Sequence, residues 1–224
     1  MHPPRSDIAR RTLGLYADAP RADRFHVWFR WLTCPFPAVE RQLPRRGTIL
    51  EVGCGHGVFS CFAALASSGR RVTGVDIDCD KISMANAAVD RAGGSQPLAE
   101  FWCLPLAELD PDRRFDAVVI IDVLYLLSSD ARTQLLAEAI RRLEPGGTLV
   151  VKEADRRPRW KAAVTVTQEL VSTRVLRITE GERVEFAPSD EFDRQLRDAG
   201  LVTTVIRADR GYVHPHVVIV GHRR

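Results

Sequence analysis

The stretch ILEVGCGHGVFS, residues 49–60, places an apolar, β-rich run directly before three glycines at alternate positions, Gly53, Gly55 and Gly57. Glu51 stands two residues before the first of them. Glycine adopts positive φ readily and leaves the backbone uncovered, so glycines after a strand predict a tight turn with a ligand lying against it. The helix expected to follow offers unpaired N–H groups to a negative group.

Strand-like and helix-like segments alternate around this stretch. We expect strands at 48–54, 71–77, 99–103, 115–123 and 148–154, separated by helices at 56–69, 81–93 and 128–143. Gly69 is expected to end the first helix, Asp80 to cap the second and Ser129 or Asp130 to cap the third, with EPGG at 144–147 turning the chain into the fifth strand. This order predicts an α/β fold with a doubly wound parallel sheet.

The end of the chain has a different pattern. A capped helix is expected at 189–200, followed by the strands LVTTVIRAD (201–209) and HVVIVGHR (216–223). Only a short loop separates these two strands, so they must be antiparallel. Five parallel strands followed by a terminal antiparallel hairpin give a seven-stranded sheet, and the hairpin turn DRGYVHPH (209–216) falls at its carboxyl edge.

Two segments lie outside this core. We expect residues 1–45 to form an N-terminal helical lid and residues 46–224 the main domain, with a helical insert around 156–186. In RFHVWFRWL, four apolar residues share one helical face; they are Phe25, Trp28, Phe29 and Leu32. This face is expected either to cover a substrate or to pack on the sheet edge.

Composition narrows the classes of function. The chain has 224 residues, of which 45% are hydrophobic and 27% charged, and its net charge of +3 is too small to indicate a nucleic-acid partner. Neither a membrane span nor a signal peptide is expected, so we predict a cytoplasmic protein. Five cysteines match no metal-binding spacing and are expected to be reduced thiols; they are Cys34, Cys54, Cys61, Cys79 and Cys103.

The glycine spacing separates two kinds of ligand. A dinucleotide fingerprint GxGxxG starting at Gly53 requires a glycine at position 58, where the chain has Val58. This argues against a dehydrogenase. A carboxylate at Glu51 also suits a ligand with an ammonium group better than it suits a pyrophosphate.

EVGCGHG followed by GVDID (74–78) resembles the first two motifs of class I S-adenosylmethionine-dependent methyltransferases, and the outline of strands along the chain matches their seven-stranded sheet. The resemblance covers roughly residues 46–155. It implies that the methionine part of S-adenosylmethionine contacts Glu51 and the loop residues Gly53, Cys54, Gly55 and Gly57. It also implies that Asp76 accepts hydrogen bonds from the ribose and that Ile77 packs on the adenine.

The sequence departs from this family after the third strand. Many relatives have an acidic residue there that holds the adenine amine, whereas this chain has CLPLAEL, with Pro105 and Leu106 near that position. We expect the backbone of Leu106 or Ala107, or the side chain of Glu108, to hold the adenine amine in its place.

Residues for the chemistry must come from the carboxyl edge. Asp122 ends the fourth strand and is expected at the cofactor site, although it also fits a plain polar strand end. Glu153 ends the fifth strand, and His214 and His216 lie in the hairpin turn; these three are the candidate catalytic residues. The alternative is that the HPH sequence only stiffens the turn. No metal site is expected.

The acceptor is expected to be a small molecule. DVLY after the fourth strand lacks the prolines typical of enzymes that methylate nucleic-acid bases, and the basic run RRPRWK (156–161) is short. We expect an apolar aromatic or acyl substrate, free or carrier-bound, held by Trp28, Tyr125 and Tyr212, with oxygen as the acceptor atom. ADRRPRWK and RGYVHPHVV also resemble methyltransferases of bacterial polyketide or fatty-acid-derived pathways.

Two alternatives stay open at this point. One is a protein that binds S-adenosylmethionine only to sense it or to serve as a scaffold. The other is a methyltransferase for lipids or quinones, in which the aromatic helix with Arg24 and Arg30 would touch a membrane surface, although no membrane contact is expected in the main interpretation.

Overall fold

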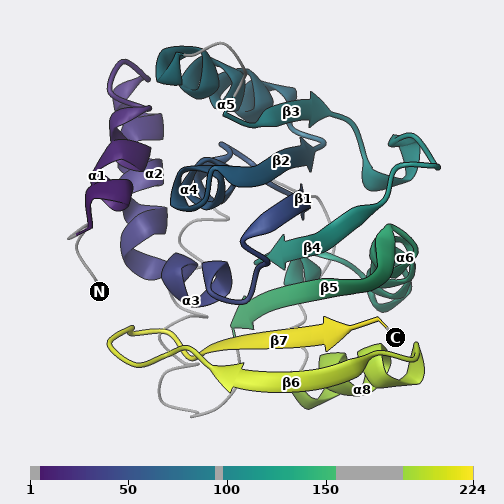
Figure 1. The fold of residues 1–224 in the computed structure, drawn as a ribbon. Coiled ribbons are helices and arrows are strands. Elements are labelled where there is room, and N and C mark those ends of the chain that lie inside the picture. The colour runs from purple at the N-terminus through teal and green to yellow at the C-terminus, as the bar shows by residue number, and fades with distance from the viewer. Residues whose placement is uncertain (1–5, 94–97, 155–188, 224) are drawn as a thin grey trace.

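A computed structural model describes residues 6–93, 98–154 and 189–223. Its sheet has seven strands in the order β3-β2-β1-β4-β5-β7-β6 (Figure 1). The strands are β1 (Arg46–Val52), β2 (Gly69–Asp76), β3 (Glu100–Cys103), β4 (Phe115–Ile121), β5 (Leu143–Ala154), β6 (Val202–Arg207) and β7 (His216–His222).

Strands β1 to β5 pair in parallel, and β7 pairs antiparallel with both β5 and β6. This confirms the predicted doubly wound sheet with its antiparallel terminal strand. The order reverses between β1 and β4, which is where ligands bind in open α/β sheets. Because β6 runs parallel to β5, the turn between β6 and β7 lies at the carboxyl edge of β1, β4 and β5.

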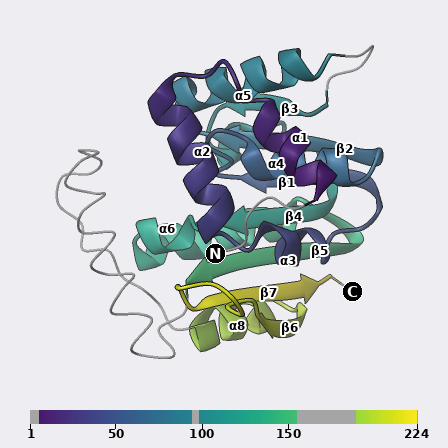
Figure 2. The same cartoon turned by 90° about the vertical axis from the view of Figure 1, so that its left-hand side faces the viewer.

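Helices cover both faces of the sheet. They are α1 (Asp7–Gly14), α2 (Arg21–Thr33), α3 (Phe36–Glu40), α4 (Val58–Ala66), α5 (Cys79–Ala92), α6 (Ser129–Arg141) and α8 (Ser189–Asp198), with short 3-10 turns η1 (Leu106–Glu108) and η2 (Leu124–Leu126). Helices α1 to α5 share one apolar cluster with the sheet, whereas α6 and α8 share another. Figure 2 shows α1 and α2 on the face that also carries α4.

Strand β4 explains why both faces are covered. Ala117 and Val119 point into the first cluster, and Val118 and Ile120 point into the second. All four are completely buried. An uninterrupted apolar run therefore suits a central parallel strand between two helical layers.

Several predicted boundaries are wrong by a few residues. Helix α4 ends at Ala66, so Gly69 begins β2 rather than ending the helix. The cap of α5 is Asp78, which accepts a hydrogen bond from the Lys81 N–H, and not Asp80. Ser128 caps α6 in the same way. The predicted turn at 144–147 lies inside β5, where the pairing with β4 shifts register.

The expected apolar face of the N-terminal helix is also wrong in part. In α2 the buried residues are Val27, Trp31 and Leu32, whereas Phe25 and Trp28 are exposed. Trp31 packs edge-on against Phe62 of α4, with ring centroids 5.0 Å apart. The helix is therefore held by a different stripe from the one that the spacing suggested.

One expectation about the cysteines is overturned: Cys79 and Cys103 form a disulfide between the start of α5 and the end of β3. Cys34, Cys54 and Cys61 are free and buried. Within the described residues, no helix combines the length and apolarity needed to cross a bilayer. The helical insert expected around 156–186 lies outside the described residues.

Candidate functional site

The three glycines after β1 have different structural tasks. All have positive φ, at 72° for Gly53, 51° for Gly55 and 70° for Gly57. A Cβ atom at Gly53 would overlap the side chain of Val123, and one at Gly57 would overlap the Phe101 ring. These two glycines allow close packing of the loop on its neighbours. They are needed for the fold whether or not a ligand is present.

Gly55 is different because its outer side is open. A Cβ atom there would meet only Cδ of Lys81, 3.7 Å away. Its N–H donates to Oδ2 of Asp76 at 2.7 Å, which joins the glycine loop to the end of β2. Gly55 is therefore the position at which a ligand can approach uncovered backbone.

Asp76 and Ile77 lie beside this opening. Oδ1 of Asp76 accepts the Asp78 N–H at 2.9 Å, so each carboxylate oxygen already accepts one backbone bond. Each oxygen keeps a second lone pair, which leaves room for two donors such as neighbouring hydroxyl groups. Ile77 is 77% exposed, so an apolar side chain next to a carboxylate is available to a flat ring.

Glu51 and Cys54 are buried under the same loop. Ser60 Oγ donates to Glu51 Oε2 at 2.5 Å. Burial raises the pKa of Glu51 to about 8 against the opposing effect of this hydrogen bond, so the carboxyl is protonated at neutral pH. Burial also raises the pKa of the Cys54 thiol, which is therefore uncharged.

The stretch expected to hold adenine is a buried turn. Leu106 is 4% exposed, and its carbonyl accepts a hydrogen bond from Arg142 at 3.3 Å. The Cys79–Cys103 disulfide stands nearer to Ile77, whose carbonyl lies 3.8 Å from the Cys103 sulfur. A ligand contact at Leu106 stays a prediction.

A buried group of charges forms the other end of the site, where β4 and β5 end. Asp122 has a φ of 55°, a strained backbone conformation for a residue other than glycine. Its carboxylate accepts from Lys152 Nζ at 2.5 Å and from Arg30 Nη1 at 2.8 Å. Burial opposes its ionisation, but the two cations outweigh burial and hold the pKa of Asp122 below its ordinary value.

Glu153 supports the loop after β4. Its Oε1 accepts the N–H groups of Val123 at 3.1 Å and Leu124 at 2.8 Å. Burial and the neighbouring Asp122 raise the pKa of Glu153 to about 8. The structure thus gives Glu153 a role in holding the loop, and its predicted part in catalysis stays a prediction.

His216 begins β7 and is 5% exposed. Its Nε2 lies 2.8 Å from the carbonyl oxygen of Thr33, which can only accept, so Nε2 carries the proton. Nδ1 is then a bare acceptor, buried and without a partner among the described residues. Burial and Lys152 lower the pKa of His216 to about 2, which keeps the ring neutral.

The other predicted residues of this edge fall into two groups. His214 and Tyr212 lie beside His216, with ring centroids 6.0 Å and 5.3 Å from it. Burial, then Lys152, lower the pKa of His214. Tyr125 lies in η2, close enough to Arg30 for the two to interact electrostatically. Trp28 is on α2 but lines a pocket with α1 instead of joining this group.

The N-terminal helices are joined directly to both ends of the site. His56, in the glycine loop, lies with Nε2 3.1 Å from Asp23 Oδ1, and its carbonyl accepts from the buried Tyr16 hydroxyl at 2.6 Å. Arg30 and Thr33 reach Asp122 and His216 at the other end. Sequence reasoning missed these contacts, because nothing in a helical repeat shows which residues face a distant strand. Only for Lys152 did the sequence contain a sign of such a contact, because a lysine inside an apolar strand needs a partner for its charge.

Comparison with known proteins identifies the family of this chain. The family model described as a methyltransferase domain matches residues 21–205. A ubiquinone biosynthesis O-methyltransferase of Bradyrhizobium is 29% identical over 156 residues, which is 70% of this chain and 58% of that protein. A fatty-acid O-methyltransferase of Mycolicibacterium smegmatis is 31% identical over 119 residues, covering 52% of this chain and 41% of that protein. The chain thus spans about half the length of these relatives.

The fold is also found in solved structures. Magnesium protoporphyrin IX methyltransferase from Synechocystis, solved with bound SAH, has a TM-score of 0.69 and 17% identity, covering 96% of this chain and 94% of that chain. Fold and site together define the class I S-adenosylmethionine-dependent methyltransferase architecture that the sequence motifs resemble. The chain belongs to the methyltransferase-domain family.

Proposed function

We propose that this protein transfers a methyl group from S-adenosylmethionine to an oxygen atom of an apolar small molecule. The observation that carries the proposal is the hydrogen bond between Gly55 and Asp76 beside the exposed side chain of Ile77. It brings open backbone, a carboxylate with spare acceptor sites and an apolar surface together at the point where the strand order reverses.

The residues present fit S-adenosylmethionine. Asp76 can accept from two ribose hydroxyls, Ile77 can stack on adenine, and Gly55 leaves room for the chain of the ligand. Glu51 lies on β1, between Gly74 of β2 and Val119 of β4, that is, between the two ends of the site. When bound, this cofactor supplies an electrophilic methyl group on a sulfonium.

The charges at the carboxyl edge favour an acceptor oxygen that is negative. Arg30 and Lys152 provide two positive charges against the single carboxylate of Asp122, and Glu153 is protonated at neutral pH. A buried excess of positive charge stabilises a carboxylate or phenolate in the acceptor. Methyl transfer needs in-line alignment more than acid–base chemistry, so holding that oxygen in place is the main task of these residues.

We assign His214 as the general base that removes the proton when the acceptor arrives as a hydroxyl group. It is half-buried in the turn before β7, so it can take a proton from the acceptor and pass it to solvent. His216 donates its Nε2 proton to the Thr33 carbonyl and has a pKa far below neutrality, so its bare Nδ1 can accept a hydrogen bond from such a hydroxyl group and orient it. Tyr125 and Tyr212 are proposed to contact the substrate from η2 and from the hairpin turn.

The names of the relatives support oxygen as the acceptor atom, because both specify O-methylation. Together with the chain's resemblance to pathway methyltransferases, they favour an acyl or aromatic substrate, free or carrier-bound, of a polyketide or fatty-acid-derived pathway. We propose that the protein is located in the cytoplasm, and we propose no nucleic-acid partner for it.

Two measurements test the proposal. Isothermal titration calorimetry of the purified chain should detect S-adenosylmethionine, and the Asp76→Asn variant should bind it at least about tenfold more weakly. Labelled methyl donor should then yield methyl ethers or esters from a panel of phenols and medium-chain carboxylic acids. Failure to bind the donor would refute the proposal, whereas donor binding with no transfer to any acceptor, including those of a cell extract, would favour a sensor or scaffold.

A further inference from the structure

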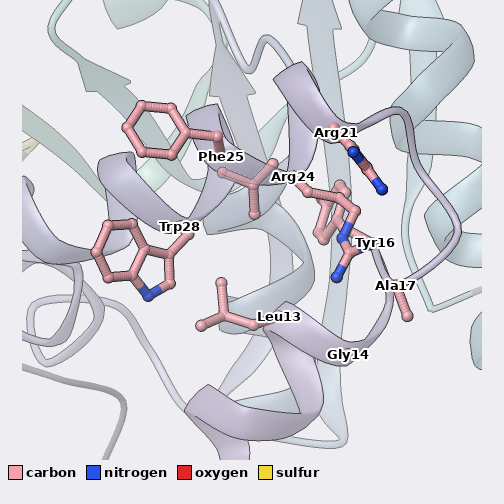
Figure 3. A pocket seen from close by; sticks show the side chains of 9 residues that line it. Leu13, Gly14, Tyr16, Ala17, Arg21, Arg24, Phe25 and Trp28 are labelled. Atoms are coloured by element: carbon pink, nitrogen blue, oxygen red, sulfur yellow. The ribbon is translucent and has the colours of Figure 1, made fainter.

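A hollow lies between the two N-terminal helices, lined by residues of α1, of α2 and of the turn between them. It has a volume of about 610 Å³, within the range of ligand-binding pockets. Leu13 and Gly14 of α1 form one wall, and α2 forms the other (Figure 3). The buried side chains of Tyr16 and Val27 also line it.

The helical repeat of α2 places this hollow apart from the site already described. Asp23 and Arg30 contact the glycine loop and Asp122, so their side of α2 faces the carboxyl edge. The 3.6-residue repeat places Arg21, Phe25 and Trp28 roughly 150–170° around the helix from that side, and Arg24 about 110° around it. A ligand in the hollow is therefore separated from the acceptor oxygen by the width of α2.

The lining is apolar at one end and positively charged at the other. Figure 3 shows Phe25 and Trp28 together, with Arg21 and Arg24 on the opposite side. Phe25 is 63% and Trp28 46% exposed, although large apolar side chains are usually covered. Within the described part of the chain, neither arginine forms an ion pair, and no acidic residue lines the hollow.

We propose that this hollow is a second ligand site, which binds a carboxylate carried on an apolar chain or ring. The guanidinium groups of Arg21 and Arg24 would hold the carboxylate, and Phe25 and Trp28 would cover the apolar part. A bilayer surface matches this lining less well, because Phe25 and Trp28 line a hollow together with Leu13 and Gly14 and do not form a flat surface. The proposal concerns a site separate from methyl transfer, so it does not depend on the proposed function.

Octanoate, octan-1-ol and acetate are suitable probes, because they separate the contribution of the charge from that of the chain. A carboxylic acid can also enter the proposed acceptor site, so the binding event that counts in calorimetry of the full chain is the one lost on changing Arg24 or Trp28. That event should be about tenfold tighter for octanoate than for either of the other two. Arg24→Gln should weaken octanoate binding about tenfold and Trp28→Ala about fivefold. Both side chains are exposed, so the thermal unfolding midpoint should stay unchanged in each variant.

Arg71→Gln and Trp102→Ala are the matched controls, since Arg71 is exposed on β2 and Trp102 is 46% exposed, like Trp28. Both should bind octanoate as the unmodified chain does. Equal binding by all four variants, or equal affinity for acetate and octanoate, would overturn the proposal. Binding of phosphatidylglycerol vesicles through Arg24 and Trp28, with no binding of free octanoate, would replace it with a membrane surface.

Discussion

Arg30 donates to the carboxylate of Asp122 at 2.8 Å, across 92 positions of sequence. The donor lies on a helix that precedes the sheet, and the acceptor ends its central strand. Because Asp122 also holds Lys152, one carboxylate joins the N-terminal helix to β4 and β5. The helix is therefore part of the site itself.

Replacing Arg30 by Met should test this connection. Asp122 keeps Lys152, so we expect a loss of about 1–3 kcal/mol in unfolding free energy and a raised KM for the acceptor. Urea denaturation and steady-state kinetics measure the two effects. Arg71→Met, which changes an exposed arginine on β2, should alter neither. If Arg30→Met and Asp122→Asn gave strictly additive losses, the pair would contribute no coupling energy.

Two glycines of one loop should respond differently to alanine. At Gly57 an added Cβ overlaps the Phe101 ring, so Gly57→Ala should lower stability by several kcal/mol, on the order of 2–4. At Gly55 only the positive φ opposes the change, which costs about 1–2 kcal/mol, but the methyl group would fill the ligand's side of the loop. Gly55→Ala should therefore lose donor affinity with the smaller drop in melting temperature. The reverse order would show that Gly55 faces no ligand.

The raised pKa of Glu51 predicts that donor binding depends on pH. A ligand with an ammonium group favours the ionised carboxyl, so binding should release a proton and tighten as pH rises from 6 toward about 8. The gain cannot exceed about tenfold per pH unit. Calorimetry in buffers of different ionisation enthalpy measures the proton release. Glu51→Gln is the control, because the donor's own amine titrates equally with both proteins; an unchanged pH profile in this variant would exclude Glu51.

His214→Ala should reduce turnover of hydroxyl acceptors by about 10²–10⁴, the usual contribution of a general base. Donor affinity should stay unchanged, since His214 lies at the opposite end of the site from Asp76. Carboxylate acceptors, which need no base, should be methylated at nearly the original rate. Equal losses for both kinds of acceptor would show that His214 only positions the substrate.

The Cys79–Cys103 disulfide should support the adenosine end of the site. It joins the start of α5 to the end of β3, with Cys103 paired in register with Asp76. Cys79→Ser combined with Cys103→Ser should weaken donor binding several-fold, on the order of 1 kcal/mol, because the loop with Ile77 is then less ordered. Dithiothreitol should have the same effect on the unmodified chain and none on the double variant. If neither the double substitution nor dithiothreitol changes the affinity for the donor, the disulfide does not support the site.

The class of fold could be predicted from the sequence because the patterns that indicate it are local. An apolar run such as Ala117–Ile121 specifies a strand buried on both faces, and a connection of only eight residues, 208–215, between Arg207 and His216 forces an antiparallel hairpin. Asp76 was likewise predicted at the end of the second strand by its distance from the glycines. Strand ends of one sheet meet at one edge, so local spacing was enough to bring Asp122, Glu153 and the two histidines together.

What the sequence by itself determined is therefore the succession of strands and helices along the chain, the glycine loop and the edge at which a ligand meets them, since each follows from short-range periodicity and turn chemistry. Only the tertiary structure decided which side of α2 faces that edge, which cysteines pair, and that the backbone carbonyl of Thr33 accepts a hydrogen bond from His216. These depend on contacts between segments far apart in the chain, where packing chooses among side chains that are equivalent in the helical repeat. For that reason Arg30, and not the aromatic stripe, joins the helix to the site.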